Sequence, residues 1–528
     1  MRGADLLVQT LAAAGVTRIF SLSGNQIMPV YDACLDAGIK ITHVRHEAAA
    51  VFMADAWAQL TGKLGVALVT AAPGFANAVG ALYTAMGSES PVLLLSGDSP
   101  VAQDGMGAFQ ELDQLAVSRA LTKRGFRPIS ADVIGEEAAL AIKVATSGRP
   151  GPVHMALPFD VLNADTAEPL PVPEAYARTR HKLCAESAAS IAAAIAGADR
   201  PVIITGPALN RTRAGDLIVD LQSLTGAPVL SLESPRGLGD PSLGDLKGAF
   251  AKADLIVSLG KAIDFTIGFG GAAFDPTAKW MVVDADADAL DRARKNLGGK
   301  LQCAIIADPD DAAEAIANQT SHGDHANWRN TVTSHIQHRA PAKPVSGITA
   351  DDVAASVQKH IDASTVAIID GGECGQWAQA GINAPARLIN GPAGAIGGCL
   401  CYAVAAKQAR PDAQVIAIMG DGTAGFHFAE FETAVRENTP LVVVIANDGR
   451  WNAEHEIQLR DYGPNRLIGC ELSDARYDQA VAGLGGHGEY VTDKADLDAA
   501  IARALASGKT ACVNVQIEGQ PAPNAGSH

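Results

Sequence analysis

The sequence has no uninterrupted run of 18 apolar residues, although 48% of its 528 residues are apolar and its mean hydropathy is +0.11. A helix that crosses a bilayer needs about 20 such residues, so a membrane-spanning protein is not expected. The first helical pattern is followed by no small-residue cleavage site, so no signal peptide is expected. These absences predict a soluble, cytoplasmic protein.

Positive charge is also scarce, because 41 Lys and Arg residues face 58 Asp and Glu residues and the net charge is −17. Nucleic-acid binding needs clustered Lys and Arg, so no such partner is expected. The eight cysteines lack metal-ligand spacing, and the only near pair, Cys399 and Cys401, would point to different faces of a helix. They are expected to be small buried side chains that stay reduced.

What the sequence does contain is three stretches in which strand and helix patterns alternate. This pattern predicts an α/β fold with parallel, doubly wound sheets, and the chain is too long for a single core. The expected domains span residues 1–163, 185–325 and 345–520, joined by a Pro-rich linker at 167–180 and a polar linker at 321–347. The middle domain has no G-x-G-x-x-G after a strand, so it lacks the dinucleotide fingerprint.

One feature of the second linker resembles a metal site. His335 and His338 are spaced i, i+3, as two ligands on one helix face would be. Their flanking residues are polar, so a solvated helix face is favoured over a metal site.

The most informative stretch runs from residue 415 to residue 451. It predicts a buried strand at 415–419, a Gly-Asp-Gly turn, a helix at 428–437, and a second buried strand at 441–446 that ends in Asn447-Asp448. Ligands of parallel sheets bind beyond the carboxyl ends of the strands. Asp421 and Asp448, 27 residues apart, are therefore expected at one edge of one sheet.

The chemistry of this edge suits a metal-bound diphosphate. Carboxylate and amide oxygens suit Mg²⁺, which keeps phosphate oxygens as partners. Gly420, Gly422 and Gly425 leave backbone N–H groups open before a helix N-terminus, as a diphosphate requires. The alternative is an ordinary helix cap at Asp421 and a strand-end turn at Asn447.

A second candidate lies near the start of the chain. Arg45-His46-Glu47 ends a predicted strand and precedes an Ala-rich helix, so Glu47 is expected at a strand's carboxyl end. A glutamate in the first turn of a helix is also favoured by the helix dipole alone.

Together these patterns resemble the thiamine diphosphate (TPP) enzymes of the acetolactate synthase, benzaldehyde lyase and 2-hydroxyacyl-CoA lyase group. The likeness covers nearly the whole chain, with further matching pieces at 14–25, 65–79, 91–98, 108–114, 149–153 and 462–469. It implies three domains: a pyrimidine-binding domain (1–163), a central Rossmann-like domain (185–325) and a diphosphate-binding domain (345–520). It also implies an active site at a subunit interface, in a homodimer or homotetramer.

The resemblance assigns roles to particular residues. Glu47 would bind the aminopyrimidine ring and so promote loss of the C2 proton, the Gly394 carbonyl would accept from the ring's amino group, and Ile396 would support the cofactor's bend. Gln110 resembles a glutamine near the reactive thiazolium, and Asn25 and Gln26 stand where the benzaldehyde lyase pattern has Ala and His. The remaining residues are expected to hold the diphosphate or line the substrate side: Gly420, Asp421, Gly422, Thr423, Asp448, Trp451, Glu454 and His455.

The metal ligands depart from the family pattern, which has Asn where this chain has Asp448. The expected set is Asp421, Asp448 and the Arg450 backbone carbonyl; a shift of one residue would instead use Asn447 and the Gly449 carbonyl. A second carboxylate would bind Mg²⁺ more tightly and repel the diphosphate.

The function implied is Mg²⁺- and TPP-dependent formation or cleavage of a C–C bond in 2-oxo acids or 2-hydroxy ketones, as in acetolactate synthase. Benzaldehyde lyase-like or 2-hydroxyacyl-CoA lyase-like cleavage is the first alternative, and a cofactor-binding homologue without activity is the second. A nucleotide-binding regulator is disfavoured, because the phosphate fingerprint is missing. FAD is doubtful, since residues 258–265 lack the arginine expected after Leu-Gly.

Overall fold

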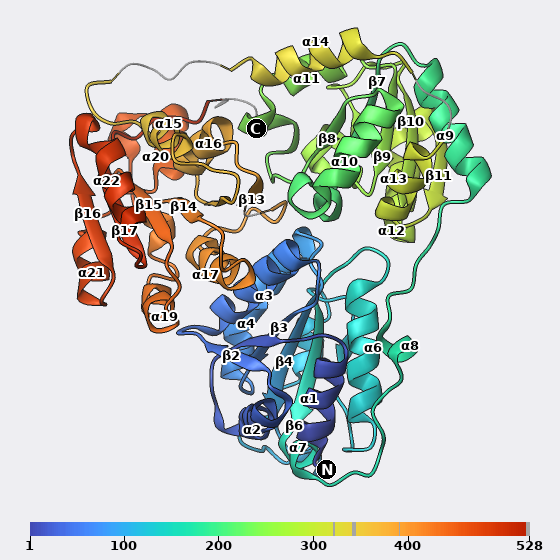
Figure 1. Ribbon diagram of the computed structural model, residues 1–528, viewed down its shortest axis with the longest axis vertical. Coiled ribbons are helices and arrows are strands. Elements are labelled where there is room, and N and C mark those ends of the chain that lie inside the picture. Colours follow the sequence, from blue (N-terminus) through green and yellow to red (C-terminus); the bar gives the residue numbers. More distant parts are fainter. Residues whose placement is uncertain (320–322, 340–344, 390, 524–528) are drawn as a thin grey trace. The chain divides into compact units, whose positions relative to one another are not determined.

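The computed structural model describes residues 1–319, 323–339, 345–389 and 391–523. The chain forms two compact units, Met1–Arg180 and His181–His528. Its strands form three sheets of six, five and six strands in which every pairing between named strands is parallel. The predicted α/β fold with three parallel sheets is thereby confirmed (Figure 1).

The first unit contains a sheet of order β2-β1-β3-β4-β6-β5. Its strands are β1 Arg18–Ser21, β2 Lys40–His43, β3 Gly65–Val69, β4 Val92–Asp98, β5 Gly125–Phe126 and β6 Val153–Pro158. Its α-helices are α1 Gly3–Ala13, α2 Met28–Ala37, α3 Glu47–Thr61, α4 Pro73–Gly87, α5 Gln114–Ser118, α6 Ile134–Thr146, α7 Phe159–Asn163 and α8 Pro173–Tyr176.

Burial explains why this sheet is parallel and central. All residues of β3, β4 and β6 are buried, as expected for strands covered on both faces. On one face, α1, α2 and α6 pack a cluster of Leu, Ile and Val side chains. Helices α3 and α4 pack against each other, and the small Ala48, Ala49 and Ala50 are buried at the start of α3.

The second unit begins with a five-stranded sheet of order β11-β10-β9-β7-β8. Its strands are β7 Pro201–Thr205, β8 Val229–Ser231, β9 Leu255–Leu259, β10 Lys279–Asp284 and β11 Leu301–Ile306. Its α-helices are α9 Ala185–Gly197, α10 Arg211–Thr225, α11 Leu246–Phe250, α12 Ala287–Leu297, α13 Pro309–Ala317 and α14 Ala326–Gln337.

Helix α14 corrects the expectation of a polar linker at 321–347. Trp328 and Val332 are buried in the core of the five-stranded sheet, and the Trp328 indole N–H donates to the Pro201 carbonyl at 2.9 Å. The polar composition of this stretch concealed two anchoring apolar side chains one turn apart. The rest of the expected linker includes residues 321–322 and 340–344, which lie outside the described residues.

A third sheet, of order β13-β12-β14-β15-β17-β16, completes the second unit. Its strands are β12 Val366–Ile369, β13 Ala386–Ile389, β14 Val415–Gly420, β15 Val442–Asn447, β16 His487–Val491 and β17 Ala511–Gln516. Its α-helices are α15 Ala350–Gln358, α16 Glu373–Gly381, α17 Cys399–Ala409, α18 Asp421–Ala424, α19 Glu430–Arg436, α20 Asn452–Tyr462, α21 Tyr477–Gly483 and α22 Lys494–Ala506.

The first and third sheets have the same strand order. When strands are counted from the start of each sheet, both read second, first, third, fourth, sixth, fifth. One scaffold thus occurs twice in the chain, once in each unit. The sheets span 18–158, 201–306 and 366–516, whereas the domain boundaries 1–163, 185–325 and 345–520 stay a prediction.

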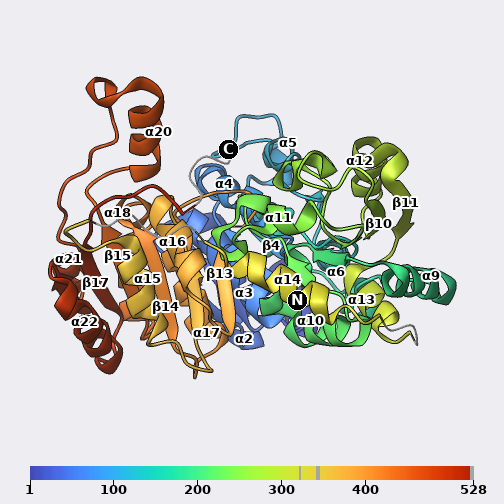
Figure 2. The same ribbon diagram turned by 90° about the horizontal axis from the view of Figure 1, so that it is seen from above.

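Helix α20 differs from the other helices around the third sheet. It contains no buried residue and stands away from the sheet in Figure 2. Among the described residues, no helix is long and apolar enough to cross a membrane.

Candidate functional site

A cavity of about 710 Å³ lies in the second unit, at the carboxyl ends of the third sheet's strands. The turn after β14 supplies Gly420, Asp421, Gly422 and Thr423, and the segment after β15 supplies Asp448. The opposite wall comes from the five-stranded domain and from α20, with residues that include Pro235, Arg236, Phe265, Asn452 and Glu454.

Asp421 and Asp448 are the charged centre of this cavity. Asp421 is only 2% exposed, and its Oδ2 atom has no hydrogen-bond partner among the described residues. Burial raises the pKa of Asp421, and burial together with the neighbouring Asp421 carboxylate raises the pKa of Asp448 to about 7. Two adjacent carboxylates, one with an unsatisfied oxygen, fit a site that holds a divalent cation.

Asn447 and Gly449, the alternative metal ligands, are already engaged elsewhere. The Asn447 amide donates to the Ala475 carbonyl and to Asn514 Oδ1, each at 3.2 Å, and its Oδ1 accepts from Gly449 N–H at 3.1 Å. The Gly449 carbonyl accepts from Leu472 N–H at 2.6 Å. Asn447 is fully buried and is absent from the cavity lining, whereas Asp448 and Arg450 line it.

The Gly-Asp-Gly turn is open at Gly420 and packed against Trp451 at Gly422. A Cβ at Gly420 would meet nothing within 4 Å, so its backbone faces open space. A Cβ at Gly422 would lie 2.7 Å from the ring of Trp451, which itself packs edge-on against Phe426. Trp451 therefore fixes the distance between the turn after β14 and the segment after β15.

Asp370, at the end of β12, organises the loop that carries Gly394 and Ile396. It is 3% exposed and accepts from the backbone N–H groups of Gly371, Gly397 and Cys399 at 2.6, 2.8 and 3.2 Å. Burial raises the pKa of Asp370 to about 6 despite these bonds. Gly394, with φ +66°, and Ile396 both line the cavity. Asp370 was not predicted from the sequence, where its only signal is an aspartate at the end of a buried strand.

The first unit has its own polar edge, also at the carboxyl ends of its strands. Glu47 is the first residue of α3 and is 8% exposed. Its Oε2 accepts from Asn77 Nδ2 at 3.1 Å. A Cβ at Gly74 would lie 3.4 Å from Glu47 Oε1 and 2.8 Å from Thr70 Cγ2, so this glycine leaves room between the two side chains. Asn77 and Thr70 were not predicted as site residues, because neither belongs to a motif with a recognisable residue spacing.

Gln110 lies at this same edge and is held by neighbouring side chains. Thr70 Oγ1 donates to Gln26 Oε1 at 2.8 Å, and Gln26 Nε2 donates to Gln110 Oε1 at 2.7 Å. Asn25, by contrast, is exposed and lies in a short 3₁₀ turn, Asn25–Ile27, after β1.

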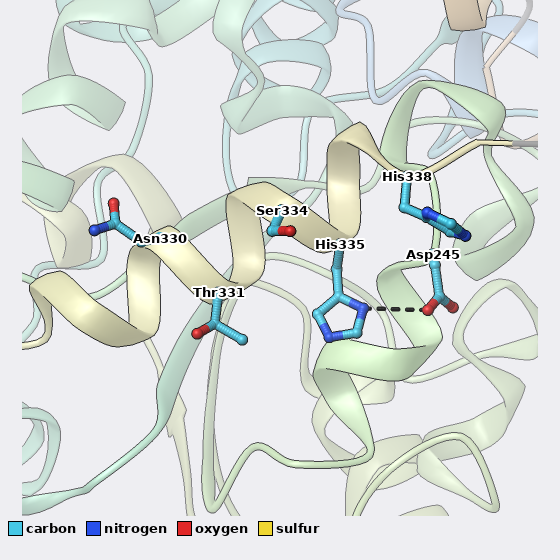
Figure 3. A pocket seen from close by; sticks show the side chains of 6 residues that line it. All are labelled: Asp245, Asn330, Thr331, Ser334, His335 and His338. Carbon is cyan, nitrogen blue, oxygen red and sulfur yellow. Dashed lines mark hydrogen bonds and ion pairs between the residues drawn. The ribbon is translucent and has the colours of Figure 1, made fainter.

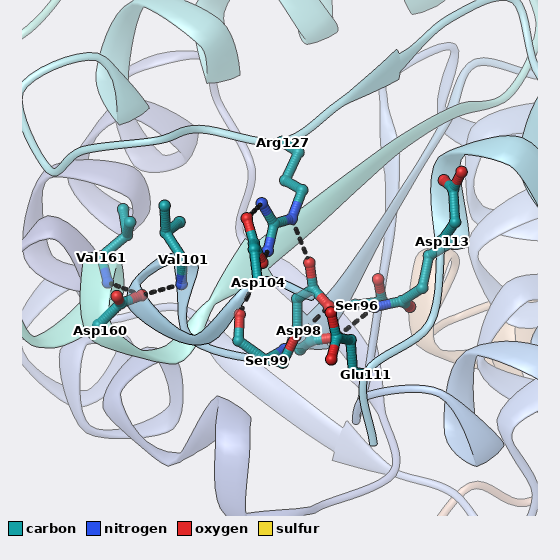
Figure 4. A network of polar contacts seen from close by, with 12 residues as sticks. Ser96, Asp98, Ser99, Val101, Asp104, Glu111, Asp113, Arg127, Asp160 and Val161 are labelled. Atoms are coloured by element: carbon teal, nitrogen blue, oxygen red, sulfur yellow. Dashed lines mark hydrogen bonds and ion pairs between the residues drawn. The ribbon is translucent and has the colours of Figure 1, made fainter. Parts of the chain in front are cut away.

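Three carboxylates hold the loop around Gln110 in place, those of Glu111, Asp98 and Asp104. Glu111 accepts from the backbone N–H groups of Gly105, Gly107 and Ala108 at 2.5, 2.8 and 3.0 Å, which lowers the pKa of Glu111. Arg127 bridges Asp98 at 2.5 Å and Asp104 at 2.7 Å (Figure 4). The loop is thus fixed at both ends.

His455 and Glu454 lie on α20. Glu454 lines the cavity, whereas His455 is half-buried, does not line the cavity, and pairs with Glu456 at 3.5 Å. The structure therefore does not place His455 among the cavity residues.

His335 on α14 and His338 just after this helix line a surface pocket of about 560 Å³ (Figure 3). His335 pairs with Asp245 at 3.1 Å and contacts Lys252 Nζ at 3.2 Å, while His338 is exposed. Among the described residues, only Asp308, Asp310 and Asp311 gather as three ligating groups. His338 follows the last residue of α14 and is exposed, whereas His335 is half-buried and ion-paired, so the expected solvated helix face stays a prediction.

The eight cysteines are all free. Five are buried, as expected, but Cys184 is exposed and corrects the general expectation of buried side chains. At the five-stranded sheet, Lys261 follows the Leu-Gly turn and pairs with Asp264 at 3.3 Å. The doubt about FAD stays a prediction.

Comparison with known proteins matches all three regions of the chain to one family. Residues 1–117 match the N-terminal TPP binding domain of thiamine pyrophosphate enzymes, residues 188–316 the central domain, and residues 370–515 the C-terminal TPP binding domain. A probable acetolactate synthase of Mycobacterium bovis is 31% identical over 539 residues, covering 98% of this chain and 95% of that protein.

The chain belongs to the thiamine pyrophosphate enzyme family. Two further relatives are the acetolactate synthase isozyme 2 large subunit of Escherichia coli K12 and 2-hydroxyacyl-CoA lyase 2 of Bos taurus. Each is 29% identical, and the matches cover 98% and 92% of this chain and 96% and 84% of the relatives. In this family the cofactor is thiamine diphosphate, so the sites on the first and third sheets lie in its two TPP-binding domains.

Proposed function

We propose that this protein is a Mg²⁺- and thiamine diphosphate-dependent carboligase or lyase that acts on 2-oxo acids or 2-hydroxy ketones, as acetolactate synthase does. The observation that carries the proposal is the cavity that brings the Gly-Asp-Gly turn, both aspartates and Ile396 together. The relatives named as acetolactate synthases add support, since the matches extend over almost the full length of each.

Asp421, Asp448 and the Arg450 carbonyl would hold Mg²⁺. The unsatisfied Oδ2 of Asp421 supports this assignment, as does the absence of Asn447 from the cavity lining. The open backbone at Gly420, with Gly422 and Thr423, would bind the diphosphate, because unobstructed N–H groups before a helix start favour anions. Trp451 would keep the metal ligands and the diphosphate turn at a fixed separation.

Gly394, Ile396 and Glu47 would bind the pyrimidine end of the cofactor. Ile396 would lie beneath the bend, and the Gly394 carbonyl would accept from the amino group. When bound, the cofactor supplies an electron sink for breaking or forming a C–C bond next to a carbonyl. Glu47 would exchange a proton with the ring nitrogen, and Asn77, which donates to Glu47 Oε2, would hold that carboxylate in place.

The substrate side would be formed by Gln110, Asn25 and residues of α20. Gln110 is ordered by its neighbours and would contact the reacting carbonyl. Glu454 would face the substrate from the cavity wall. A role for His455 is proposed only as part of the α20 cover, because it does not line the cavity.

The active enzyme would be a cytoplasmic homodimer or homotetramer whose active site joins the pyrimidine-binding domain of one subunit to the diphosphate-binding domain of another. Its partners would be small carbonyl compounds. Light scattering of the loaded enzyme tests this arrangement, and a fully active monomer would contradict it.

2-Hydroxyacyl-CoA lyase-like or benzaldehyde lyase-like cleavage is the second candidate, favoured by the 29% identity to the bovine lyase. The deciding experiment incubates the Mg²⁺- and thiamine diphosphate-loaded protein separately with pyruvate, benzoin and a 2-hydroxyacyl-CoA. Mass spectrometry of the products identifies the reaction. Acetolactate from pyruvate supports the first proposal, aldehydes from the other substrates support the second, and no product from any of them contradicts both.

A further inference from the structure

The Gln110 side chain is the last member of a chain of hydrogen bonds that begins at Thr70 and passes through Gln26. Thr70 follows β3, Gln26 follows β1, and Gln110 follows β4, so three strand ends contribute to one chain of hydrogen bonds. Thr70 donates to Gln26 at 2.8 Å, and Gln26 donates to Gln110 at 2.7 Å. In this arrangement the hydrogen bonds run in one direction, from Thr70 through Gln26 to Gln110.

This direction leaves one end of Gln110 for a ligand. Its Oε1 is taken by Gln26, while its Nε2 donates to no acceptor among the described residues. Gln26 itself is 7% exposed, so it is nearly sealed from solvent and cannot exchange its partners for water freely.

The surrounding backbone is shaped to fit this chain of side chains. A Cβ at Gly24 would lie 2.3 Å from Thr70 Cβ, and a Cβ at Gly97 would lie 2.8 Å from Gln26 Cβ. The backbone of Gln110 has φ +59°, a left-handed conformation that residues other than glycine rarely adopt. The Glu111 carboxylate holds the preceding part of the same loop through the backbone N–H groups of Gly105, Gly107 and Ala108.

The same group of residues adjoins Glu47. Thr70 Cγ2 and Glu47 Oε1 flank the vacant Cβ position of Gly74 at 2.8 and 3.4 Å. The hydrogen-bond chain and the glutamate therefore belong to one edge and one site.

We infer that Gln26 and Thr70 are positioning residues that make Gln110 present its amide N–H₂, rather than its carbonyl, to the reacting substrate oxygen. This inference rests on the proposed function. An attacked carbonyl oxygen gains negative charge, and an oriented N–H donor stabilises that charge. The substrate oxygen that meets Gln110 would then be the carbonyl oxygen of an aldehyde, a ketone or a 2-oxo acid, because that oxygen gains the negative charge.

The decisive variant is Gln26→Glu, studied in the full-length enzyme with Mg²⁺ and thiamine diphosphate. The ionised carboxylate accepts from Thr70 but cannot donate to Gln110, so the Gln110 amide would turn over and present its carbonyl. The protonated carboxyl donates as the native amide does. We expect kcat of the variant to fall by roughly tenfold or more at pH 8, because loss of one oriented donor costs about 10²–10³ in kcat. The kcat should recover as the pH is lowered and the carboxyl group is protonated.

Gln103→Glu is the matched control, since it makes the same charge change at an exposed position near the same loop. Its pH profile should follow that of the wild type. Calorimetric titration should give unchanged cofactor affinity for Gln26→Glu, which separates an oriented donor from general damage to the fold. A variant profile that matches Gln103→Glu overturns the inference and leaves the proposed function intact.

A second measurement does not depend on turnover. The urea midpoints of Gln26→Met, Gln110→Met and the double variant test whether the two amides interact. We expect the double variant to unfold at the midpoint of the weaker single variant, whereas fully additive shifts would overturn the inference. If the wild type shows no cofactor-dependent turnover, the proposed function fails, and this cycle still decides whether the hydrogen-bond chain exists.

Discussion

The first and third sheets share one strand order but differ in how the polar groups at their carboxyl ends are partnered. At the first sheet the polar groups have partners: Thr70, Gln26 and Gln110 bond to one another, Glu47 accepts from Asn77, and Asp98 at the end of β4 pairs with Arg127. The third sheet ends in three buried or half-buried carboxylates, Asp370, Asp421 and Asp448. The same scaffold therefore presents two different surfaces to a ligand.

The difference lies in which partners complete each edge. At the first sheet, the polar groups largely satisfy one another, and one amide donor is left over. At the third sheet, Asp370 is satisfied by backbone N–H groups, but Asp421 has an oxygen with no partner in the described chain. The first edge thus leaves a neutral hydrogen-bond donor without a partner, whereas the third-sheet edge leaves a carboxylate oxygen without one in the described chain.

Removing the central carboxylate of the third sheet should have the largest effect. Asp421→Ala is expected to weaken Mg²⁺-dependent cofactor binding by ~100-fold or more, because even residues outside the ligand shell cost ~10–100-fold in metal affinity. Isothermal titration calorimetry with Mg²⁺ and thiamine diphosphate measures this loss. Asp412→Ala, at an exposed position before the same strand, is the control and should bind normally. Unchanged affinity in Asp421→Ala would remove the metal site from the third sheet.

Substitution of Glu47 on the first sheet should have a different effect from Asp421→Ala, because it should lower turnover while leaving cofactor affinity nearly unchanged. Glu47→Gln keeps the shape of the side chain but removes its negative charge, so kcat is expected to fall by ~100-fold or more, the range of general acid–base catalysis. Cofactor affinity should stay within about threefold, because the diphosphate and metal contacts are untouched.

Glu136→Gln is the matched control for Glu47→Gln. Glu136 is also a first-turn glutamate of a helix, α6, but it is exposed. If Glu47→Gln were as active as Glu136→Gln, the helix dipole alone would account for Glu47, and the contrast between the two sheets would lose its catalytic meaning.

The sequence was sufficient for those parts of the site that depend on local pattern. Buried strands that end in Gly420-Asp421 and Asn447-Asp448 predicted the sheet edge, because apolar runs bounded by turn residues reveal strand ends. Thr70, Asn77 and Gln26 form contacts across 44, 30 and 84 positions of chain. Such contacts follow from strand order, which no local spacing encodes. Trp328 was missed for a related reason, since its partner Pro201 lies 127 residues away.

The buried His154 in the core of the first unit should make the stability of the first and third sheets depend differently on pH. His154, the second residue of β6, is fully buried between the hydroxyls of Ser96 and Ser118 at 2.8 and 2.9 Å. Burial lowers the pKa of His154 to about 3. The second residue of the equivalent strand β17 is Cys512, and burial raises the pKa of its thiol.

Acid should therefore weaken the first unit before the second. The folded state keeps His154 neutral, whereas the unfolded chain binds a proton below about pH 6.5. The stability that depends on neutral His154 is present above that pH and is lost as the pH falls towards 3. Between pH 6.5 and 4.5 the loss is roughly 2–3 kcal/mol of unfolding free energy.

Peptide-resolved hydrogen exchange at pH 7.5 and 4.5 measures this loss. Exchange of β3, β4 and β6 should accelerate more than exchange of β14, β15 and β17. His154→Gln, which retains a donor and an acceptor but does not titrate, should reduce the difference. Equal acceleration in both sheets, or no change with His154→Gln, would show that His154 does not cause the loss of stability of the first sheet at acidic pH.

The smallest expected effect concerns the two adjacent carboxylates at the carboxyl ends of the third sheet's strands. Asp448→Asn removes one of the two adjacent carboxylates of the third sheet while keeping an oxygen ligand. Without metal, the repulsion between Asp421 and Asp448 is then lost, so we expect the melting temperature of the metal-free protein to rise by about 2–4 °C, equivalent to ~1 kcal/mol. With Mg²⁺ and thiamine diphosphate, affinity should be retained or improved, because the diphosphate meets less negative charge. Differential scanning calorimetry with and without Mg²⁺ gives both values. A lower melting temperature without metal would mean that the second carboxylate stabilises the empty edge, and the third sheet would then resemble the first in satisfying its own polar groups.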